Sequence, residues 1–232
     1  NHKILTIDNL SLQEFDSEAE LIPLLTPEDE EEMNNEELPE SLPILPLRNM
    51  VLFPGVVIPI TAGRDKSIKL INDANASGKN IGVVAQKNEE DEDPTKDDIH
   101  TVGTVARILR VLKMPDGNIT IILQGKKRFE LLEMVEEDPF FKGKVKLIED
   151  TPVQKEDKHF EALLSTIKDL AAQIIQLSPN FPSEATMILK NIESPIFLIN
   201  FVGSNLNIEL QEKQGLLEIN GVSEKAEKLV EF

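Results

Sequence analysis

The sequence predicts an α+β protein in which an acidic tail precedes a small β-rich lobe with one short helix and then an α-helical bundle lobe. Residues 42–150 consist of short β-branched, apolar runs separated by turn residues, as in a set of short strands. After Thr151 and Pro152 the apolar residues recur with helical spacing. Residues 1–41 hold 13 acidic side chains and one lysine, within a formal net charge of −18.

The tail, residues 1–41, contains the run TPEDEEEMNNEELPES. Like charges of this density keep a segment solvated, so we expect the whole tail to be disordered. A short strand or helix at residues 4–12 that docks on the folded part is the alternative. The rest of the chain is only mildly acidic and shows no basic stripe, so we do not expect nucleic acid to bind this domain directly.

The β-rich lobe opens with LPILPLRNMVLFPGVVIPI, residues 42–60, which carries Pro43, Pro46, Pro54 and Pro59. A proline cannot donate a hydrogen bond to a neighbouring strand, so this apolar run cannot pair along its whole length. Such a run does not form an open pairing edge, yet it can still present apolar side chains to a partner. It suits a domain that meets unfolded chains, although many of its side chains must form the core.

One short helix interrupts the β pattern between residues 63 and 79. Ile68, Leu70 and Ile71 form its apolar side, and Ser77 and Gly78 end it. At its start lies GRDKS, in which Ser67 or Asp65 can accept hydrogen bonds from the first helical N–H groups.

The loop that holds GRDKS has two interpretations. Arg64 and Lys66 either form a structural ion pair beside a helix cap or project as a contact point for another chain. Loops held between a strand and a helix often carry recognition residues.

About six strands with short connections predict a small closed or nearly closed barrel. Asp116 and Gly117 form the strongest hairpin signal, because glycine accepts the positive φ of the turn. Glycines 103, 125 and 143 stand where strands of such a barrel bend. After the opening run, the expected strands are 80–86, 101–114, 118–125, 127–135 and 140–150.

Residues 87–98 contain seven carboxylates and one proline, which indicates an exposed loop. A metal site is the alternative, but the loop lacks the D-x-[DN]-x-[DN]-G spacing of a calcium loop.

The helical lobe is expected over residues 151–219, with helices at 160–177, 183–191, from Pro195 onward, and at 208–217. The third helix, IFLINFVGSNL, is apolar nearly all round, so it is either the central helix of the bundle or a self-association face. Residues 220–232 begin a further helix without a stop signal, which predicts the start of a long helix towards a further module.

The sequence contains no catalytic motif. It has no cysteine, no H-E-x-x-H, no G-x-S-x-G and no glycine-rich phosphate-binding loop. We therefore expect this chain by itself not to be an enzyme and to hold no cofactor or metal. The lack of cysteine, of a signal peptide and of a membrane-spanning apolar run predicts a cytoplasmic protein without a membrane partner.

The motifs resemble the N-terminal domain of the bacterial Lon family of ATP-dependent serine proteases. The opening L-P-x-L-P-L-R, the F-P and the G-R-x-x-S make the resemblance specific; it is strong over residues 42–150 and weaker afterwards. The matching stretches, in the order of the family, are LPILPLRNMVLFPGVVIPI, GRDKSI, VGTVARI, LKMPDGN and LQGKKRFEL.

This resemblance implies a PUA-like barrel lobe, a helical bundle, recognition of unfolded or damaged protein substrates, and self-association within a homohexameric parent. It places ATP, Mg²⁺ and the Ser-Lys peptidase site in modules beyond this chain, so no catalytic residue is assigned here. The candidate contacts with substrate or partner, by their positions in the matching motifs, are Phe53, Pro54, Arg64, Asp65 and Lys66.

Two functions from different classes follow. The first is a substrate-recognition and assembly domain of a Lon-type protease, which predicts that the parent continues into a G-x-x-x-x-G-K-[ST] motif. The second is a stand-alone adaptor with a Lon-like binding domain and no ATPase. Binding of RNA through the barrel lobe would need a basic face, which the charge balance disfavours.

Overall fold

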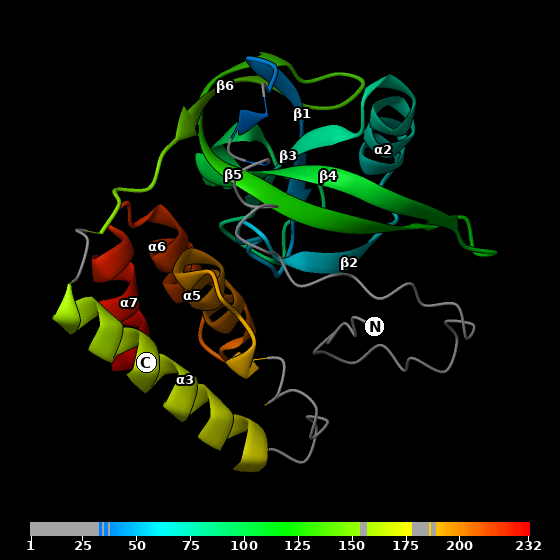
Figure 1. Ribbon diagram of the computed structural model, residues 1–232. Helices are drawn as coiled ribbons and strands as arrows, with labels where there is room; N and C mark the ends of the chain where they lie inside the picture. Colours follow the sequence, from blue (N-terminus) through cyan, green and yellow to red (C-terminus); the bar gives the residue numbers. More distant parts are fainter. Residues whose placement is uncertain (1–32, 34, 37, 154–156, 178–185, 187–188) are drawn as a thin grey trace.

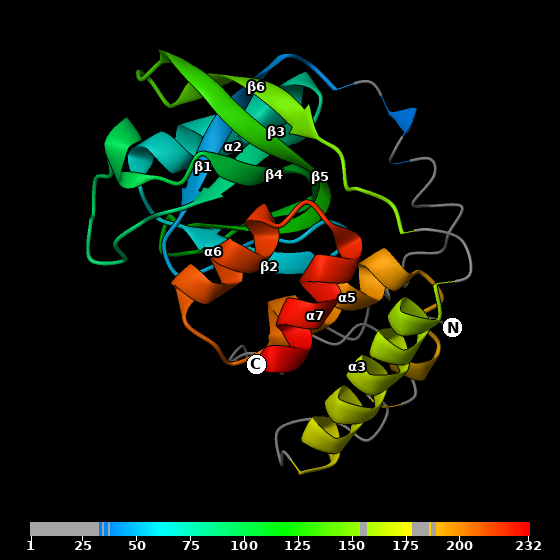
Figure 2. The same ribbon diagram turned by 90° about the vertical axis from the view of Figure 1, so that its left-hand side faces the viewer.

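The protein has two lobes, a β-barrel with one helix at its side and a group of helices below it (Figures 1 and 2). This arrangement confirms the predicted α+β class. The computed structural model describes residues 33, 35–36, 38–153, 157–177, 186 and 189–232.

The elements of the barrel lobe are β1 (Ser41–Leu47), β2 (Val57–Ala62), α2 (Asp65–Ser77), β3 (Asn80–Ala85), the 3₁₀ turn η1 (Lys96–Asp98), β4 (Val102–Lys113), β5 (Ile119–Glu136) and β6 (Lys142–Ile148). Those of the helical lobe are α3 (Lys158–Leu177), α5 (Pro195–Asn205), α6 (Leu210–Glu218) and α7 (Val222–Glu231).

The six strands form one sheet in the order β2-β5-β4-β3-β1-β6, and a further β5–β6 pairing closes it into a barrel. The predicted small barrel is therefore confirmed. The closure leaves out one strand, because β2 pairs with β5 alone and stands at the end of the sheet order.

The proline-rich run forms two strands, β1 and β2, separated by residues 48–56, which are not in a strand. Residues 41–43 of β1 pair with β6 only, and residues 44–47 pair with β3 only. Each half of β1 thus needs hydrogen bonds on one side, which explains how Pro43 and Pro46 fit a strand that lies inside the sheet. The limited pairing of β1 therefore comes from this change of partner. The expectation that the run forms no open pairing edge is wrong for β2, which pairs with β5 alone and keeps one edge unpaired among the described residues.

Residues 119–136 form one long strand, β5, where the sequence indicated two. Its pairing with β4 and with β6 shifts register, which lets one strand bend round the barrel. Gly125 lies at the bend, and a Cβ there would stand 2.3 Å from the carbonyl oxygen of Phe53. The glycine is required because the backbone of the residue 51–56 loop approaches so closely.

Helix α2 ends at Gly78 (φ 129°), as predicted, and buries Leu70, Ile71 and Ala74. The predicted side-chain cap is wrong. The N-cap residue is Arg64, which makes no capping side-chain hydrogen bond, and Ser67 is buried in the first turn of the helix.

Helix α5 starts with Ser194, whose side chain accepts a hydrogen bond from the Phe197 N–H, followed by Pro195 at the first helical position. The helix buries most of its surface, so it is the central helix of the lobe and not a free self-association face. Helices α3 and α6 also agree with the prediction, and α7 confirms a helix after residue 220. That α7 begins a long helix towards a further module stays a prediction. The helix predicted at 183–191 falls mainly on residues outside the described ones.

The larger of two hydrophobic clusters runs from the barrel into the helical lobe. It contains Phe53 and Leu123 from the barrel together with Leu198, Leu217 and Ala226 from the helices. A smaller cluster around Phe129 belongs to the barrel only. The two lobes are thus joined by apolar packing.

The packed part of the chain begins before residue 42, where the sequence analysis placed the end of the tail. Ser41 opens β1, the Glu40 carbonyl accepts a hydrogen bond from the Val145 N–H, and Glu36 forms an ion pair with the buried Lys126. The predictions for residues 1–32 lie outside the described residues. Within the described part, no helix is both long enough and apolar enough to cross a membrane.

Candidate functional site

A groove of about 470 Å³ opens between the end of β1, strand β2 and the start of α2. Residues 45–50 form one wall, residues 59–64 the other, and Ser67 of α2 closes one side. Its volume lies in the range of ligand-binding clefts. The groove exists because the proline-rich run leaves the sheet after Leu47 and returns to it only at Val57.

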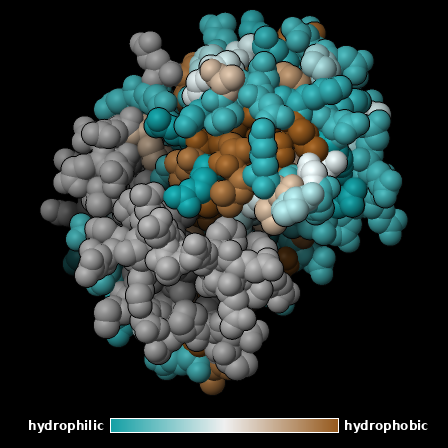
Figure 3. Space-filling view, turned by 90° about the vertical axis from the view of Figure 1, so that its right-hand side faces the viewer, coloured by the Kyte–Doolittle hydropathy of each residue, from teal (hydrophilic) through white to brown (hydrophobic). Residues whose placement is uncertain are grey.

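The groove is lined mainly by apolar groups, with cationic side chains near one part of it. Met50, 38% exposed, and the half-buried Pro59 and Ile60 supply apolar surface. Figure 3, viewed from the side on which α2 lies in Figure 1, shows an apolar area among hydrophilic residues. Arg48 and Arg64 line the same groove, so it offers apolar contact and positive charge together.

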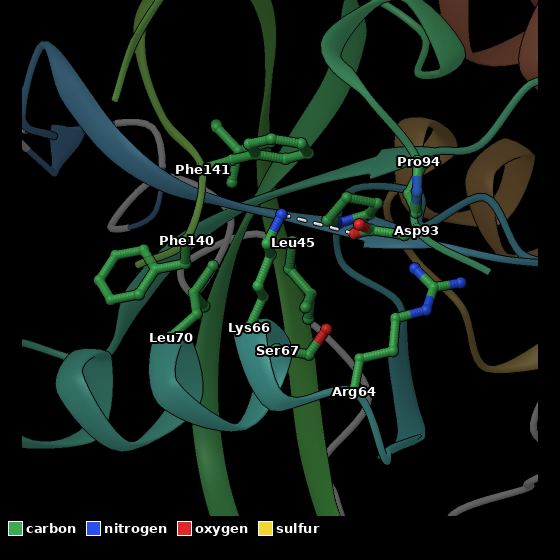
Figure 4. Close-up of a pocket in the computed structure, with 11 residues that line it drawn as sticks. Leu45, Arg64, Lys66, Ser67, Leu70, Asp93, Pro94, Phe140 and Phe141 are labelled. Atoms are coloured by element: carbon green, nitrogen blue, oxygen red, sulfur yellow. Dashed lines mark hydrogen bonds and ion pairs between the residues drawn. The ribbon is translucent and has the colours of Figure 1, made fainter. Parts of the chain in front are cut away.

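A second cavity lies on the other side of the Arg64 side chain, between α2 and the residues around Phe141 (Figure 4). Its volume is about 30 Å³, far below the range of ligand-binding clefts. The groove along β2 is the larger candidate site.

Arg64 is held in place by neutral acceptors. One of its terminal nitrogens donates to Gln86 Oε1 at 2.8 Å and to the carbonyl oxygen of Asp91 at 3.3 Å. Partial burial, and secondarily the Arg48 cation, lower the pKa of Arg64 from its usual value, and the nearby acidic residues oppose this. Arg64 thus fixes the 86–91 segment against the start of α2 and also contributes charge to the groove.

The other charged residues of GRDKS are exposed. Lys66 Nζ lies 3.5 Å from Asp93 Oδ1 and 5.9 Å from the centre of the Phe141 ring (Figure 4). Asp65 is exposed in the first turn of α2, where a negative charge is favourable. Of the first interpretation, the structure shows, among the described residues, an ion pair of Lys66 with Asp93 but no side-chain helix cap and no ion pair of Arg64. The role of the motif as a contact point stays a prediction.

Phe53 does not lie on the surface. It is 1% exposed and belongs to the core that joins the two lobes, which contradicts its prediction as a side-chain contact for a partner. Pro54 is half-buried, and its carbonyl oxygen accepts a hydrogen bond of 3.3 Å from Asn200 of α5. The F-P pair therefore links the barrel to the helical lobe, because the loop turns inward between β1 and β2.

The sequence analysis did not single out Arg48, Met50 or Ile60 as site residues. They lie in the same proline-rich run that drew attention, but their exposure depends on where that run leaves the sheet. Pro59 could have indicated this site, because proline inside a strand is typical of an edge strand.

The site can bind, and nothing in its arrangement assigns it a reaction. Among the described residues, no group of three or more His, Asp or Glu side chains is placed to hold a metal ion. Of the carboxylates of the 87–98 loop, Asp93 pairs with Lys66, and Asp98 caps the short 3₁₀ turn.

Residues 41–232 match the family model described as the ATP-dependent protease La (LON) substrate-binding domain. The chain is 74% identical over 226 residues to a Lon protease of Flavobacterium johnsoniae, covering 97% of this chain and 28% of that protein. It is 49% identical to a Lon protease of Cytophaga hutchinsonii, covering 92% of this chain and 26% of that protein. The chain thus spans about a quarter of the length of these relatives.

Solved structures share the fold. The N-terminal domain of Mycobacterium avium complex Lon protease aligns with a TM-score of 0.65 at 22% identity, over 82% of this chain and 96% of that one. A Lon N-terminal domain protein from Xanthomonas campestris aligns with a TM-score of 0.59 at 20% identity, over 83% and 98% of the two chains. From the family match over nearly all of the described residues and these relatives, the chain belongs to the substrate-binding domain family of Lon proteases.

Proposed function

We propose that this chain binds unfolded or damaged polypeptides and helps deliver them to the ATPase and peptidase modules of a Lon-type ATP-dependent protease. The observation that carries the proposal is the match of residues 41–232 to a family described as a substrate-binding domain. The much greater length of the curated relatives favours this role over that of a stand-alone adaptor.

The groove along β2 has the chemistry that such substrates need. Unfolded chains expose apolar side chains that a folded protein buries, and the groove offers Met50, Pro59 and Ile60 as apolar contacts. We expect the affinity of one domain to be weak, so that several copies in a homohexamer raise the effective concentration.

The remaining parts of the activity are assigned to the parent protein. We place ATP, Mg²⁺ and the catalytic serine in its other modules and the whole protein in the cytoplasm. Sequencing the gene beyond the codon for Phe232 tests the first point: a G-x-x-x-x-G-K-[ST] motif is expected, and an early stop codon would indicate the adaptor instead.

The binding role is tested by fluorescence anisotropy of a labelled, permanently unfolded polypeptide titrated with this chain, with the folded form as the comparison. Saturable binding of the unfolded form only is expected. Met50→Ser should weaken that binding, whereas Met114→Ser should not. The two methionines are similarly exposed, at 38% and 40%, but only Met50 lines the groove. No binding of the unfolded polypeptide would overturn the proposal.

A further inference from the structure

Strand β2 has one edge that pairs with no other strand among the described residues. Its six residues pair in an unbroken antiparallel register with β5, from Val57 opposite Gln124 to Ala62 opposite Ile119. No strand follows it on the other side of the sheet order. That other edge carries main-chain groups able to pair with an added strand.

Pro59 identifies which main-chain groups face this edge. In an antiparallel pair, successive residues turn their N–H and C=O groups alternately towards and away from the partner. Proline has no N–H, so Pro59 fits a position whose main-chain groups face away from β5. The main-chain groups of Val57 and Thr61, two residues before and after it, face the same way because the register is unbroken. The 3.0 Å contact between the Thr61 and Thr120 hydroxyls supports this assignment, because side chains approach most closely at pairs of residues that exchange no main-chain hydrogen bonds.

The free edge opens into the groove described above. Residues 59–62 of β2 line one wall, and residues 45–47 of β1 line the opposite wall. Those β1 residues pair with β3 on one side only. The groove is therefore a gap in the barrel between residues 59–62 of β2 and residues 45–47 of β1, and each of these two segments has a strand partner on its far side alone.

The charges of the groove select the kind of chain that fits. Arg48 is exposed, and no ion pair of Arg48 occurs within the described residues. Arg64 donates to an amide oxygen and a main-chain carbonyl, so it too keeps a positive charge that no direct carboxylate contact neutralises. A carboxylate side chain on the occupant would be attracted to this pair.

We propose that an extended segment of an unfolded polypeptide, with alternating apolar side chains and one acidic side chain, adds as a strand to the free edge of β2. Val57 and Thr61 donate main-chain hydrogen bonds to it, its apolar side chains pack in the groove, and its carboxylate lies near Arg48 and Arg64. This inference rests on the proposed function and gives it a binding mode.

Strand addition explains how one site can bind many sequences, since every extended chain offers the same main-chain groups. Pro59 removes the central donor of the edge, which keeps the added strand short and easy to release. A second copy of this chain is a poorer occupant, because each copy carries a formal net charge of −18 and like charges repel.

The test compares Thr61→Pro with Thr61→Val. The first removes the outward N–H at a position equivalent to Pro59, and the second keeps it; both remove the hydroxyl contact with Thr120. The probe is a fluorescein-labelled, acetylated and amidated peptide of alternating leucine and serine with one glutamate. We expect Thr61→Pro to weaken binding about tenfold and Thr61→Val to leave it within about twofold.

Hydrogen exchange of the wild-type chain gives a second readout that does not depend on a variant folding. Saturating peptide should slow exchange at the amides of Val57 and Thr61, while Ile58 and Ile60, already bonded to β5, should change little. Unchanged exchange at Val57 and Thr61 despite saturable peptide binding would overturn strand addition.

The outcomes separate this inference from the proposed function. If a permanently unfolded polypeptide binds the wild type and a correctly folded Thr61→Pro variant equally well, strand addition is wrong and the proposed function stands. If it does not bind the wild type, both are wrong. If the Val57 and Thr61 amides become more protected as the protein concentration rises, without any peptide, then a second copy of this chain occupies the edge. That result would overturn the inference.

Discussion

Two clusters of an arginine, a lysine and an aspartate lie in different surroundings in this molecule. At the junction of the lobes, Arg128 Nη2 lies 2.7 Å and Lys225 Nζ 3.7 Å from Asp150 Oδ1, and both basic side chains are buried. Beside the groove, at the smaller second cavity, Lys66 pairs with Asp93 at 3.5 Å with both side chains exposed. Arg64, which lines both the cavity and the groove, lies nearby, and we call these three residues the rim cluster.

The difference in burial gives the two clusters different roles. The junction cluster connects three distant segments, because Arg128 of β5 also donates to the carbonyl oxygens of Leu217 and Ile219 at 2.7 and 3.0 Å. Charges removed from water must be fully paired, so this cluster fixes the geometry of the lobes. The rim cluster is screened by solvent, and its charges remain available to a ligand.

The largest effect should follow from Arg128→Met. It leaves the Leu217 and Ile219 carbonyl oxygens without the Arg128 donor and removes the closer of the two cations from Asp150. We expect the free energy of unfolding, measured by urea denaturation, to fall by about 3–5 kcal/mol. Arg48→Met, at an exposed position, should change it by less than about 0.5 kcal/mol. Similar values for the two variants would contradict the role assigned to the junction.

Lys225 should give the junction a distinctive pH dependence. Burial lowers the pKa of Lys225 from 10.5 to about 8, and the nearby Asp150 only partly opposes this. Between about pH 8 and pH 10.5 the unfolded chain therefore binds more protons than the folded one at this residue, so the Lys225 contribution raises stability as the pH rises. Below pH 8 the buried charge costs up to about 3 kcal/mol.

Lys225→Met removes this titration. At pH 7 we expect the variant to be more stable than the wild type, because Asp150 keeps Arg128 as its closer partner. This difference in the free energy of unfolding should decline as the pH rises from 8 to 10.5. Urea denaturation of both proteins at each pH measures it. Lys228→Met on the exposed part of α7 serves as the control, with a difference that stays nearly constant over the same range. A constant difference for Lys225→Met as well would show that its pKa is not lowered.

The two clusters also differ in what the sequence revealed. GRDKS could be identified as a candidate contact from the sequence because Arg64 and Lys66 lie close together in a loop between a strand and a helix. Arg128, Asp150 and Lys225 are far apart in the sequence, and only the path of β5 and the placement of α7 bring them together. Their charges gave no signal, because buried and exposed charged residues look alike in a linear pattern.

The same limit applies to the strands and to the predicted contacts. Turns with a local cause, at Gly78, at Asp116 and Gly117, and at Ser194, were predicted correctly. The division of the proline-rich run into β1 and β2, and the continuity of β5, depend on partners far along the chain. Phe53 was misplaced for this reason: an apolar pattern does not tell which residues of a loop turn inward.

The smallest effect on stability is expected at the rim. In a double-mutant cycle with Lys66→Ala and Asp93→Ala, we expect a coupling free energy of at most about 0.5 kcal/mol, because solvent screens this exposed pair. The matched cycle with Arg128→Ala and Asp150→Ala should give a coupling several times larger, if both single variants fold. Comparable coupling free energies in the two cycles would contradict the conclusion that burial makes the junction pair stronger than the rim pair. A small coupling free energy at the rim would instead mean that Lys66 can leave Asp93 and, with Arg64, contact an acidic ligand with little loss in the free energy of unfolding.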